Sequence, residues 1–368
     1  MRIVEIVPQL ASGGGERFVV DLSNELVGMG HQVKLIVFHS LERPELAFYL
    51  PELDERVEVE SMNKRIGADL GLPFRIYRAV KAYGPDVVHT HLNGIVYSAF
   101  SALRPSRVVH CHTVHSAADK EAGGSFVCRG VRSLLFKSHK VIPVTISAES
   151  NASFRDFYGM DAPMIPNGRN IPDRVEISTE VLEEIDALKR SASSRVIVNL
   201  ARIMDVKRQD LIARVCKRLE LEGFDFVMLM IGRRGDERVV QGVEATGCSS
   251  VHLLGERTNP LQYLAAADGY CLMSSYEGMP ISLIEALGCH CVPVCTPVGG
   301  IKNVVRDGVN GFLAEDLSEA ACYLALKRFL DTDKATLEQM KKEARVSYAP
   351  YSMRECAQKY VELFQNNA

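Results

Sequence analysis

The chain has 368 residues, of which 47% are hydrophobic and 24% charged, and its formal net charge at pH 7 is −3. This composition is typical of a globular protein and excludes a disordered chain. The near balance of 43 basic and 46 acidic residues excludes a dedicated nucleic-acid binder. No apolar run reaches the roughly 20 residues that span a bilayer. The N-terminus MRIVEIVPQL lacks the apolar core and cleavage site of a signal peptide. We expect a cytoplasmic protein of about two domains.

The first half of the chain alternates short β-branched runs with amphipathic stretches of helical length. Helices are predicted at residues 17–30, 74–83 and 126–138. The predicted strands are residues 2–8, 33–38, 57–61, 86–91, 107–114 and 141–147. Alternating strands and helices predict a parallel sheet with helices on both faces.

The same alternation begins again after a proline- and glycine-containing segment at 164–174. The predicted strands of the second half are residues 195–202, 226–232, 251–255, 269–275 and 291–296, and the last helix is 353–365. The sequence therefore predicts an α/β protein with two doubly wound domains. Ligands of such domains bind outside the carboxyl ends of the strands, so we expect the two domains to face a cleft.

The ten cysteines contain no C-x-x-C pair, and a chain of this length needs no disulfide framework. We expect reduced thiols, several of them buried. A metal site at Cys289, His290, Cys291 and Cys295 is an alternative, but the strand-like alternation of this run buries Cys291 and Cys295 together.

Three consecutive glycines, Gly13 to Gly15, follow the first strand and open a helix. Glycines there let the backbone approach a phosphate, and a helix N-terminus favours an anion. The spacing is not that of a nicotinamide-binding fingerprint. A tight turn between strand and helix is the alternative interpretation of these glycines.

Two cations, Arg202 and Lys207, follow the first strand of the second half in LARIMDVKRQD. At the mouth of a parallel sheet they could clamp a diphosphate, although solvated surface charges are the commoner outcome. Gly232 ends the next strand, where a nucleoside could lie against bare backbone.

Two carboxylates, Glu277 and Glu285, are eight residues apart in SSYEGMPISLIEALG. The helix after the turn at Gly278–Pro280 would present its N-terminal amides to an anion. A capping Glu277 and a surface Glu285 are the alternative. Glu285 lies among apolar residues, however, and a carboxylate placed there usually has a partner.

Five of the ten histidines lie within 27 residues, at or after predicted strand ends: His89, His91, His110, His112 and His115. Strand alternation puts His89 and His91 on one face, and likewise His110 and His112. No Cys or acidic residue completes a zinc ligand pattern in the sequence, so we expect no metal. Histidines that bind hydroxyls or transfer protons fit this position better.

Taken in order, these segments resemble the retaining family 4 glycosyltransferases of the GT-B fold, of the type that assembles bacterial polysaccharides. The resemblance extends from GGGERFVVDLSNELVGMGHQV through PDVVHTHLNG, HTVHSAADKE, LARIMDVKRQD and SSYEGMPISLIEALG to VGG and DGVNGFL. It implies an acceptor-side Rossmann-like domain at 1–168 with the terminal helix 350–368, and a donor-binding Rossmann-like domain at 169–349.

The resemblance also implies roles for individual residues. His115 is the expected active-site histidine, with His112 as the alternative. Arg202 and Lys207 would hold the donor diphosphate and offset leaving-group charge, and Glu277 would hold sugar hydroxyls. Glu285 would accept hydrogen bonds from the ribose. The residues expected to contact the nucleotide-sugar are Gly14, Gly15, Arg202, Lys207, Gly232, Glu277, Gly278, Met279, Pro280, Ile281 and Glu285.

The expected reaction is retaining transfer of a sugar from a nucleotide-sugar, with a UDP-sugar favoured over a GDP-sugar, to a glycan or lipid-linked glycan. The resemblance implies that no metal or other cofactor is required. The residues agree with this, since cations are available for the leaving phosphate and no nucleophile has an obvious adjacent base. A nucleotide-sugar epimerase and a non-catalytic docking subunit of the same fold are the alternatives.

Residues 62–140 contain 12 basic and four acidic residues, a net of +8. Basic and bulky apolar residues share the predicted helix 126–138, and such a helix can lie on an anionic membrane. A core helix with a solvated basic face is the alternative. If the membrane interpretation holds, the protein is peripheral on the inner face of the membrane and its acceptor is lipid-linked.

Overall fold

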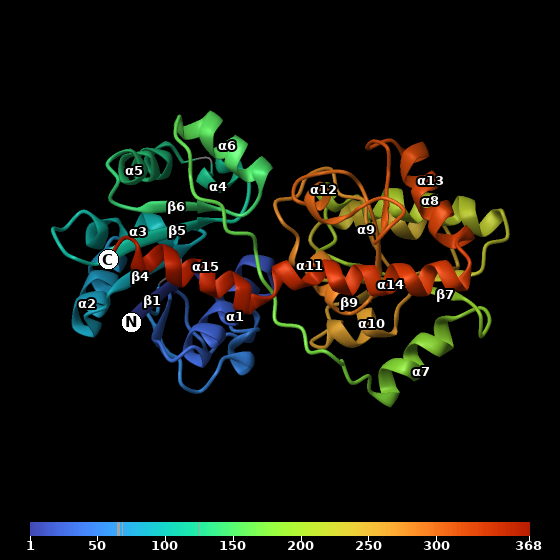
Figure 1. The fold of residues 1–368 in the computed structure, drawn as a ribbon, viewed down its shortest axis with the longest axis horizontal. Helices are drawn as coiled ribbons and strands as arrows, with labels where there is room; N and C mark the ends of the chain where they lie inside the picture. The colour runs from blue at the N-terminus through green and yellow to red at the C-terminus, as the bar shows by residue number, and fades with distance from the viewer. Residues whose placement is uncertain (65–66, 68, 124) are drawn as a thin grey trace. The chain divides into compact units, whose positions relative to one another are not determined.

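The computed structural model describes residues 1–64, 67, 69–123 and 125–368, and these form two compact units (Figure 1). Unit 1 comprises Met1–Asn170 and Tyr351–Ala368, and unit 2 comprises Ile171–Pro350. The charge count for residues 62–140 includes Arg65, which lies outside the described residues. Within the described residues, no helix combines the length and the apolar character needed to cross a membrane.

Unit 1 contains a six-stranded parallel sheet in the order β3-β2-β1-β4-β5-β6. All six strands predicted for this half are present, with ends that differ by a few residues. The strands are β1 (Arg2–Val7), β2 (Gln32–Val37), β3 (Glu58–Ser61), β4 (Val87–His91), β5 (Val109–Val114) and β6 (Ile142–Thr145).

Helices cover both faces of this sheet. Helices α1 and α15 pack on the face that carries Ile3, Val87 and Cys111, and α2 packs on the face that carries Val4 and Val88. The helices of unit 1 are α1 (Gly14–Gly28), α2 (Leu72–Tyr83), α3 (Gly94–Ala102), α4 (Ala118–Ala122), α5 (Phe126–Lys137), α6 (Ala148–Tyr158) and α15 (Met353–Gln365).

Unit 2 contains a second six-stranded parallel sheet in the order β12-β11-β10-β7-β8-β9. Its strands are β7 (Arg195–Leu200), β8 (Phe226–Ile231), β9 (Val251–Gly255), β10 (Gly269–Leu272), β11 (Val292–Cys295) and β12 (Phe312–Leu313). Five of them were predicted. The two-residue strand β12 was missed because it is too short to show an alternating pattern.

The helices of unit 2 connect and cover these strands. They are α7 (Thr179–Leu188), α8 (Gln209–Leu221), α9 (Glu237–Ala245), α10 (Pro260–Ala266), α11 (Ile281–Gly288), α12 (Ile301–Val304), α13 (Glu319–Asp331) and α14 (Lys334–Tyr348), with a 3₁₀ turn η3 (Asp205–Lys207) before α8. Two α/β units of this kind confirm the predicted GT-B fold class, which the structural relatives described below share.

Each sheet has one point at which the chain reverses its direction of strand addition. In unit 1 this switch point lies between neighbouring strands β1 and β4, and in unit 2 between neighbouring strands β7 and β10. The loops after two such strands diverge to opposite faces and leave a crevice at their carboxyl ends, where ligands of doubly wound sheets bind.

Candidate active site

At the switch point of unit 2, an ion pair joins the loop after β7 to the loop after β10. Lys207, in the loop after β7, donates to Glu277 Oε1 at 2.5 Å, and Glu277 follows β10. Ser274 Oγ donates to the same carboxylate oxygen at 2.6 Å. The amide of Ser275 also donates to the carbonyl of Val206 at 2.9 Å. The tertiary structure thus brings together two predicted residues that are 70 positions apart.

Two glycines, Gly299 and Gly300, pack against the loop that carries Glu277. Gly299 has a φ of +54°, and a Cβ there would lie 2.0 Å from the Glu277 carbonyl oxygen. The Gly300 amide donates to the Gly278 carbonyl at 2.6 Å. Only glycine fits such a close approach of two backbones. The VGG segment therefore supports the loop that carries Glu277 and Gly278.

Arg202 lies at the same end of the sheet, and its side chain is exposed. Its carbonyl accepts a hydrogen bond of 3.0 Å from the buried side chain of Gln209. Gly232 has a φ of +151°, and a Cβ there would lie 2.1 Å from the Ala201 carbonyl oxygen. The segment after β8 thus lies directly against the segment that carries Arg202. Because Gly232 has no side chain, a ligand there would meet bare backbone.

Glu285 lies in the middle of helix α11 and is only 6% exposed, so the alternative of a surface carboxylate is wrong. Glu277 is similarly buried at 7%. Burial raises the pKa of the Tyr270 phenol far above its usual range, and both carboxylates add to this shift, so both lie near that ring. Helix α11 begins directly after Pro280. The two candidate donor-binding carboxylates therefore lie on either side of its first turn along the chain, Glu277 before it and Glu285 after it.

At the switch point of unit 1, the three glycines form the turn from β1 into α1. Gly13 is the N-cap of α1 in an extended conformation, Gly14 is exposed, and a Cβ on Gly15 would lie 3.2 Å from the Leu92 side chain. Gly94, which opens α3 after β4, lies so close to β1 that a Cβ would be 2.8 Å from the Ile6 carbonyl oxygen. Small residues therefore let both loops of the switch point approach each other.

The predicted sharing of strand faces by the histidines is confirmed. His89 and His91 point to the face covered by α1 and α15, where His89 lies 4.9 Å from the Tyr360 ring. Its register partner Cys111 shares that face, whereas His112 pairs with Thr90 on the other face.

An acidic residue that the sequence pattern did not connect with the histidines, Glu5 of β1, lies between His89 and His91. Its Oε2 is 2.7 Å from His91 Nε2 and 3.1 Å from His89 Nδ1, and all three side chains are fully buried. Burial by itself would raise the pKa of Glu5, but attraction to and hydrogen bonds with His89 and His91 outweigh it and lower the pKa to about 2. One signal for Glu5 was present in the sequence: an acidic residue in the middle of the apolar strand RIVEIV.

The two candidate active-site histidines differ in accessibility. His115 is half-buried, and its Nε2 lies 3.0 Å from His91 Nδ1. Burial, together with the neighbouring His91, lowers the pKa of His115 to about 3. His112 is completely buried; its Nδ1 lies 2.9 Å from Thr90 Oγ1, and its Nε2 lies 3.2 Å from an Arg132 nitrogen. Of the two, His115 is therefore the less buried residue.

A buried carboxylate and a buried guanidinium hold the loop that carries His115. Glu121 Oε2 accepts from the amides of His115 at 2.6 Å and Ser116 at 3.2 Å. Arg132 is 1% exposed; it contacts the other oxygen of Glu121 at 3.3 Å and donates to the Leu92 carbonyl at 2.8 Å. Arg132 was counted with the basic face of helix 126–138, and this was wrong, because its charge is used inside unit 1.

Metal-ligating residue types gather at one place within the described residues, the cluster of Glu5, His89 and His91. The separation of 2.7 Å between Glu5 Oε2 and His91 Nε2 is that of a hydrogen bond, shorter than the spacing of two ligands on one zinc ion. All ten cysteines are free thiols, and Cys291 and Cys295 are buried as predicted.

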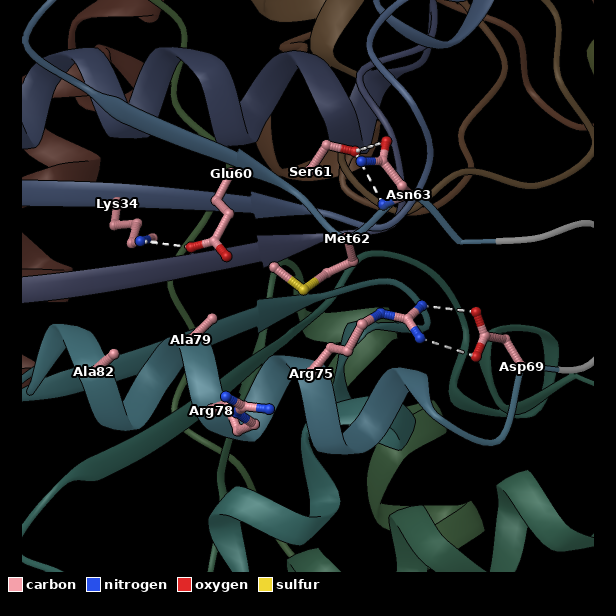
Figure 2. Close-up of a pocket in the computed structure, with 10 residues that line it drawn as sticks. All are labelled: Lys34, Glu60, Ser61, Met62, Asn63, Asp69, Arg75, Arg78, Ala79 and Ala82. Atoms are coloured by element: carbon pink, nitrogen blue, oxygen red, sulfur yellow. Dashed lines mark hydrogen bonds and ion pairs between the residues drawn. The ribbon is translucent and has the colours of Figure 1, made fainter.

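An open pocket of about 830 Å³ lies between the edge strand β3 and helix α2 in unit 1 (Figure 2). Lys34 points to Glu60 at 2.6 Å, and Arg75 forms an ion pair with Asp69 at 2.7 Å. The sequence did not indicate this pocket. It belongs to the edge of the sheet, because β2 separates β3 from the switch point.

Two Rossmann-like units with polar switch points are the architecture of a GT-B glycosyltransferase, and comparison with known proteins identifies the family. Residues 12–171 match the model described as Glycosyltransferase Family 4, and residues 181–347 match the model described as Glycosyl transferases group 1. The chain therefore belongs to the family 4 and group 1 glycosyltransferases, and it is an enzyme of the hexosyltransferase class. This excludes the docking subunit, and the curated relatives below are transferases rather than epimerases.

Two curated relatives match over most of their length. One, from Campylobacter jejuni, is the N-acetylgalactosamine-N,N'-diacetylbacillosaminyl-diphospho-undecaprenol 4-alpha-N-acetylgalactosaminyltransferase; it is 28% identical over 88% of this chain and 89% of its own. The other, from Escherichia coli, is the UDP-Gal:alpha-D-GlcNAc-diphosphoundecaprenol alpha-1,3-galactosyltransferase, 24% identical over 81% of this chain and 78% of its own. The Anabaena protein HepE, solved with UDP-glucose, has a TM-score of 0.82 at 17% identity over the whole of both chains, which shows a shared fold.

Proposed function

We propose that this enzyme transfers a hexose, with retention of configuration, from a UDP-sugar to a glycan linked through a diphosphate to a polyprenol, in the synthesis of a cell-surface polysaccharide. The observation that carries the proposal is the pairing of Lys207 with Glu277 across the switch point of unit 2, beside the buried Glu285. The named acceptors of both curated relatives are diphosphoundecaprenol-linked sugars, and one relative uses UDP-Gal.

The positive charge at the switch point of unit 2 supports a donor that carries a diphosphate. Lys207 and the exposed Arg202 supply the positive charge that a leaving diphosphate requires, and fixed cations stabilise such charge most where water is excluded. Glu285 accepts hydrogen bonds from the ribose hydroxyls, and Glu277 does so from the donor sugar. The backbone from Gly278 through Met279 and Pro280 to Ile281 holds the sugar and a phosphate at the start of α11, and Gly232 leaves room for the base.

Unit 1 supplies the remaining proposed groups. Gly14 and Gly15 begin α1 at its switch point, where exposed amides can meet a phosphate. His115, the less buried of the two candidate histidines, contacts a substrate hydroxyl. Because cations are present for the leaving phosphate and no nucleophile with an adjacent base is assigned, the leaving phosphate itself takes up the acceptor proton in a front-face displacement, and neither a metal nor another cofactor is required.

A panel of UDP-, GDP- and ADP-sugars tests the donor assignment. Thermal unfolding should shift upward with one UDP-sugar, because a ligand at about 100 times its Kd adds roughly 2.7 kcal/mol to the free energy of unfolding. Transfer to an undecaprenyl-diphosphate-linked acceptor should follow with the same donor, and NMR of the product should show the anomeric configuration of the donor. Glu285→Gln should abolish both responses, whereas Glu338→Gln, an exposed carboxylate of α14, should change neither. Stabilisation by none of the nucleotides would contradict the proposal.

We also propose that unit 1 binds an anionic membrane through α2, α3 and α5. In α5, Phe126 is 89% and Val127 70% exposed, and the exposed cations Arg129 and Lys137 lie on the same helix. The exposed Phe74 of α2 stacks on Phe100 of α3 at 5.0 Å. Apolar side chains interleaved with cations match the headgroup region of an anionic bilayer. This arrangement would place the protein on the inner membrane face, where a lipid-linked acceptor is accessible.

Co-sedimentation with phosphatidylglycerol vesicles at low salt measures this association. The wild type should pellet, and the double variant Phe126→Ser, Val127→Ser should pellet several-fold less, because the buried apolar area supplies part of the binding energy. Leu221→Ser removes an apolar side chain that is 77% exposed from α8 of unit 2 and should have no effect. Equal recovery of wild type in the supernatant with and without vesicles would refute membrane binding.

A further inference from the structure

A continuous chain of buried hydrogen bonds runs from helix α15 to His115. Tyr360 OH lies 2.7 Å from Thr113 Oγ1, and Thr113 Oγ1 lies 2.8 Å from His89 Nε2. His89 Nδ1 contacts Glu5, Glu5 contacts His91 Nε2 at 2.7 Å, and His91 Nδ1 lies 3.0 Å from His115 Nε2. Each inner member of this chain uses both of its polar ends.

The direction of every hydrogen bond in this chain follows from Glu5. An ionised carboxylate only accepts, so the ring nitrogens that face it, His89 Nδ1 and His91 Nε2, must both carry protons. The low pKa of Glu5, about 2, means that it is ionised at neutral pH. Since a neutral imidazole holds one proton, His91 Nδ1 is left as an acceptor, and it can be satisfied only by a proton on His115 Nε2.

The opposite end of the chain is consistent with the same assignment. Where His89 holds a single proton, its Nε2 accepts the hydroxyl proton of Thr113, whose oxygen accepts from Tyr360. His91 gains no proton at neutral pH, because burial, and then the neighbouring His89, lowers the pKa of His91 to about 3. From Glu5 to His115 the chain therefore has a single arrangement of protons in which every contact is one donor and one acceptor.

We propose that Glu5 is a positioning residue that acts through His91 to hold His115 as a neutral imidazole with its proton on Nε2 and a lone pair on Nδ1. His115 then meets its substrate only as a hydrogen-bond acceptor. It favours a group that donates, such as a sugar hydroxyl, and disfavours a carboxylate or a phosphate oxygen at that point. It also cannot serve as a cationic acid for the leaving group. This inference rests on the proposed role of His115 but makes a claim about proton position that is independent of turnover.

The test is ¹⁵N NMR of the imidazole nitrogens in full-length protein labelled at histidine, with His115 assigned by the loss of its signal in His115→Gln. We expect a pyrrole-type shift for Nε2 and a pyridine-type shift for Nδ1 at pH 7. The opposite tautomer or an imidazolium would overturn the proposal even if transfer activity is normal. Conversely, the expected tautomer in a protein that transfers no sugar would contradict the proposed function alone.

The role of Glu5 is tested by Glu5→Gln, which keeps the shape of the side chain but replaces one acceptor with a donor. The His115 signals should become a mixture of tautomers, and kcat should fall about tenfold or more with little change in the KM of the donor. Tyr360→Phe removes only the far end of the chain and should leave the His115 signals and kcat near wild type. A single unchanged tautomer with wild-type kcat in Glu5→Gln would overturn the assignment. One tightly bound metal ion per purified protein molecule would also overturn the assignment. A metal ion would bind through the nitrogen lone pairs of His89 Nδ1 and His91 Nε2, and in the proposed arrangement both of these nitrogens carry protons.

Discussion

The two switch points of this enzyme are built from different chemistry although their sheets have the same topology. In unit 2 the candidate groups are ionic and partly accessible, with Lys207 meeting Glu277 at the end of the sheet. In unit 1 the charged groups Glu5, Glu121 and Arg132 are buried and act behind His115. The charged groups of the two units therefore have different proposed roles. Unit 2 offers charge to a ligand directly, and unit 1 uses charge internally to fix the position and protonation of a neutral side chain. Loss of the buried guanidinium in unit 1 should therefore chiefly cost stability, and loss of the Lys207 cation in unit 2 should chiefly cost activity.

The largest expected effect on stability is that of Arg132→Leu. The substitution leaves Glu121 buried without its guanidinium partner, and breaking a buried ion pair in this way costs about 3–5 kcal/mol. Urea unfolding should show this loss. Arg129→Leu removes an exposed cation three residues earlier in α5 and should stay within about 0.5 kcal/mol of wild type. Equal effects of the two substitutions would contradict the buried role of Arg132.

Lys207→Ala should chiefly affect activity. Loss of a positioned group that stabilises transition-state charge lowers kcat by about 100- to 1000-fold, or about 2.7–4 kcal/mol. Stability should fall by less than in Arg132→Leu, because the Lys207 side chain is 20% exposed and Ser274 Oγ still donates to the buried Glu277. Steady-state kinetics and urea unfolding on the same preparation separate the two quantities. Lys334→Ala, an exposed lysine in the same unit, is the control, and undiminished turnover of Lys207→Ala would remove it from the site.

Gly299→Ala should affect both quantities in unit 2. A Cβ at this position meets the Glu277 carbonyl oxygen at 2.0 Å on a backbone with positive φ, so the loop must shift or the backbone must strain, at about 1–3 kcal/mol. The shift should also lower kcat because it moves Glu277. Gly308→Ala has a similar φ of +72° but only one atom at 4.0 Å, so it should lose stability through strain alone and retain activity. Activity that survives unchanged in Gly299→Ala would show that the loop tolerates displacement.

The smallest effect is the pH dependence that His110 adds to the stability of unit 1. Burial lowers its pKa from 6.5 to about 4, so the unfolded chain binds a proton at pH 5 that the folded chain does not. Stability therefore falls as the pH drops from about 6.5 towards 4, and His110 accounts for about 2 kcal/mol of that loss at pH 5. His110→Asn should flatten the curve of unfolding free energy against pH by this amount. His139→Asn, at an exposed histidine, should leave the slope unchanged.

Much of the fold could be predicted because it depends on local patterns. The strands of both sheets were recognisable from β-branched runs, and glycines marked the turn between β1 and α1. In unit 2, Arg202, Lys207, Glu277 and Glu285 could be named because the family pattern places them at fixed spacings after strand ends. The pocket between β3 and α2 was not predictable, because it depends on the packing of an edge strand against a helix that follows it in the chain.

The sequence by itself determined the order of strands and helices, the family, and the residues at each loop, because these depend on neighbours within a few positions. Only the tertiary structure decided which of these residues share an environment. Glu5 meets His89, 84 positions away, because β1 and β4 are neighbours in the sheet. Arg132 lies inside unit 1 although its helix is rich in exposed cations. Burial and pairing across strands are properties of the folded sheet, and they connect His115 through His91 to the buried carboxylate of Glu5.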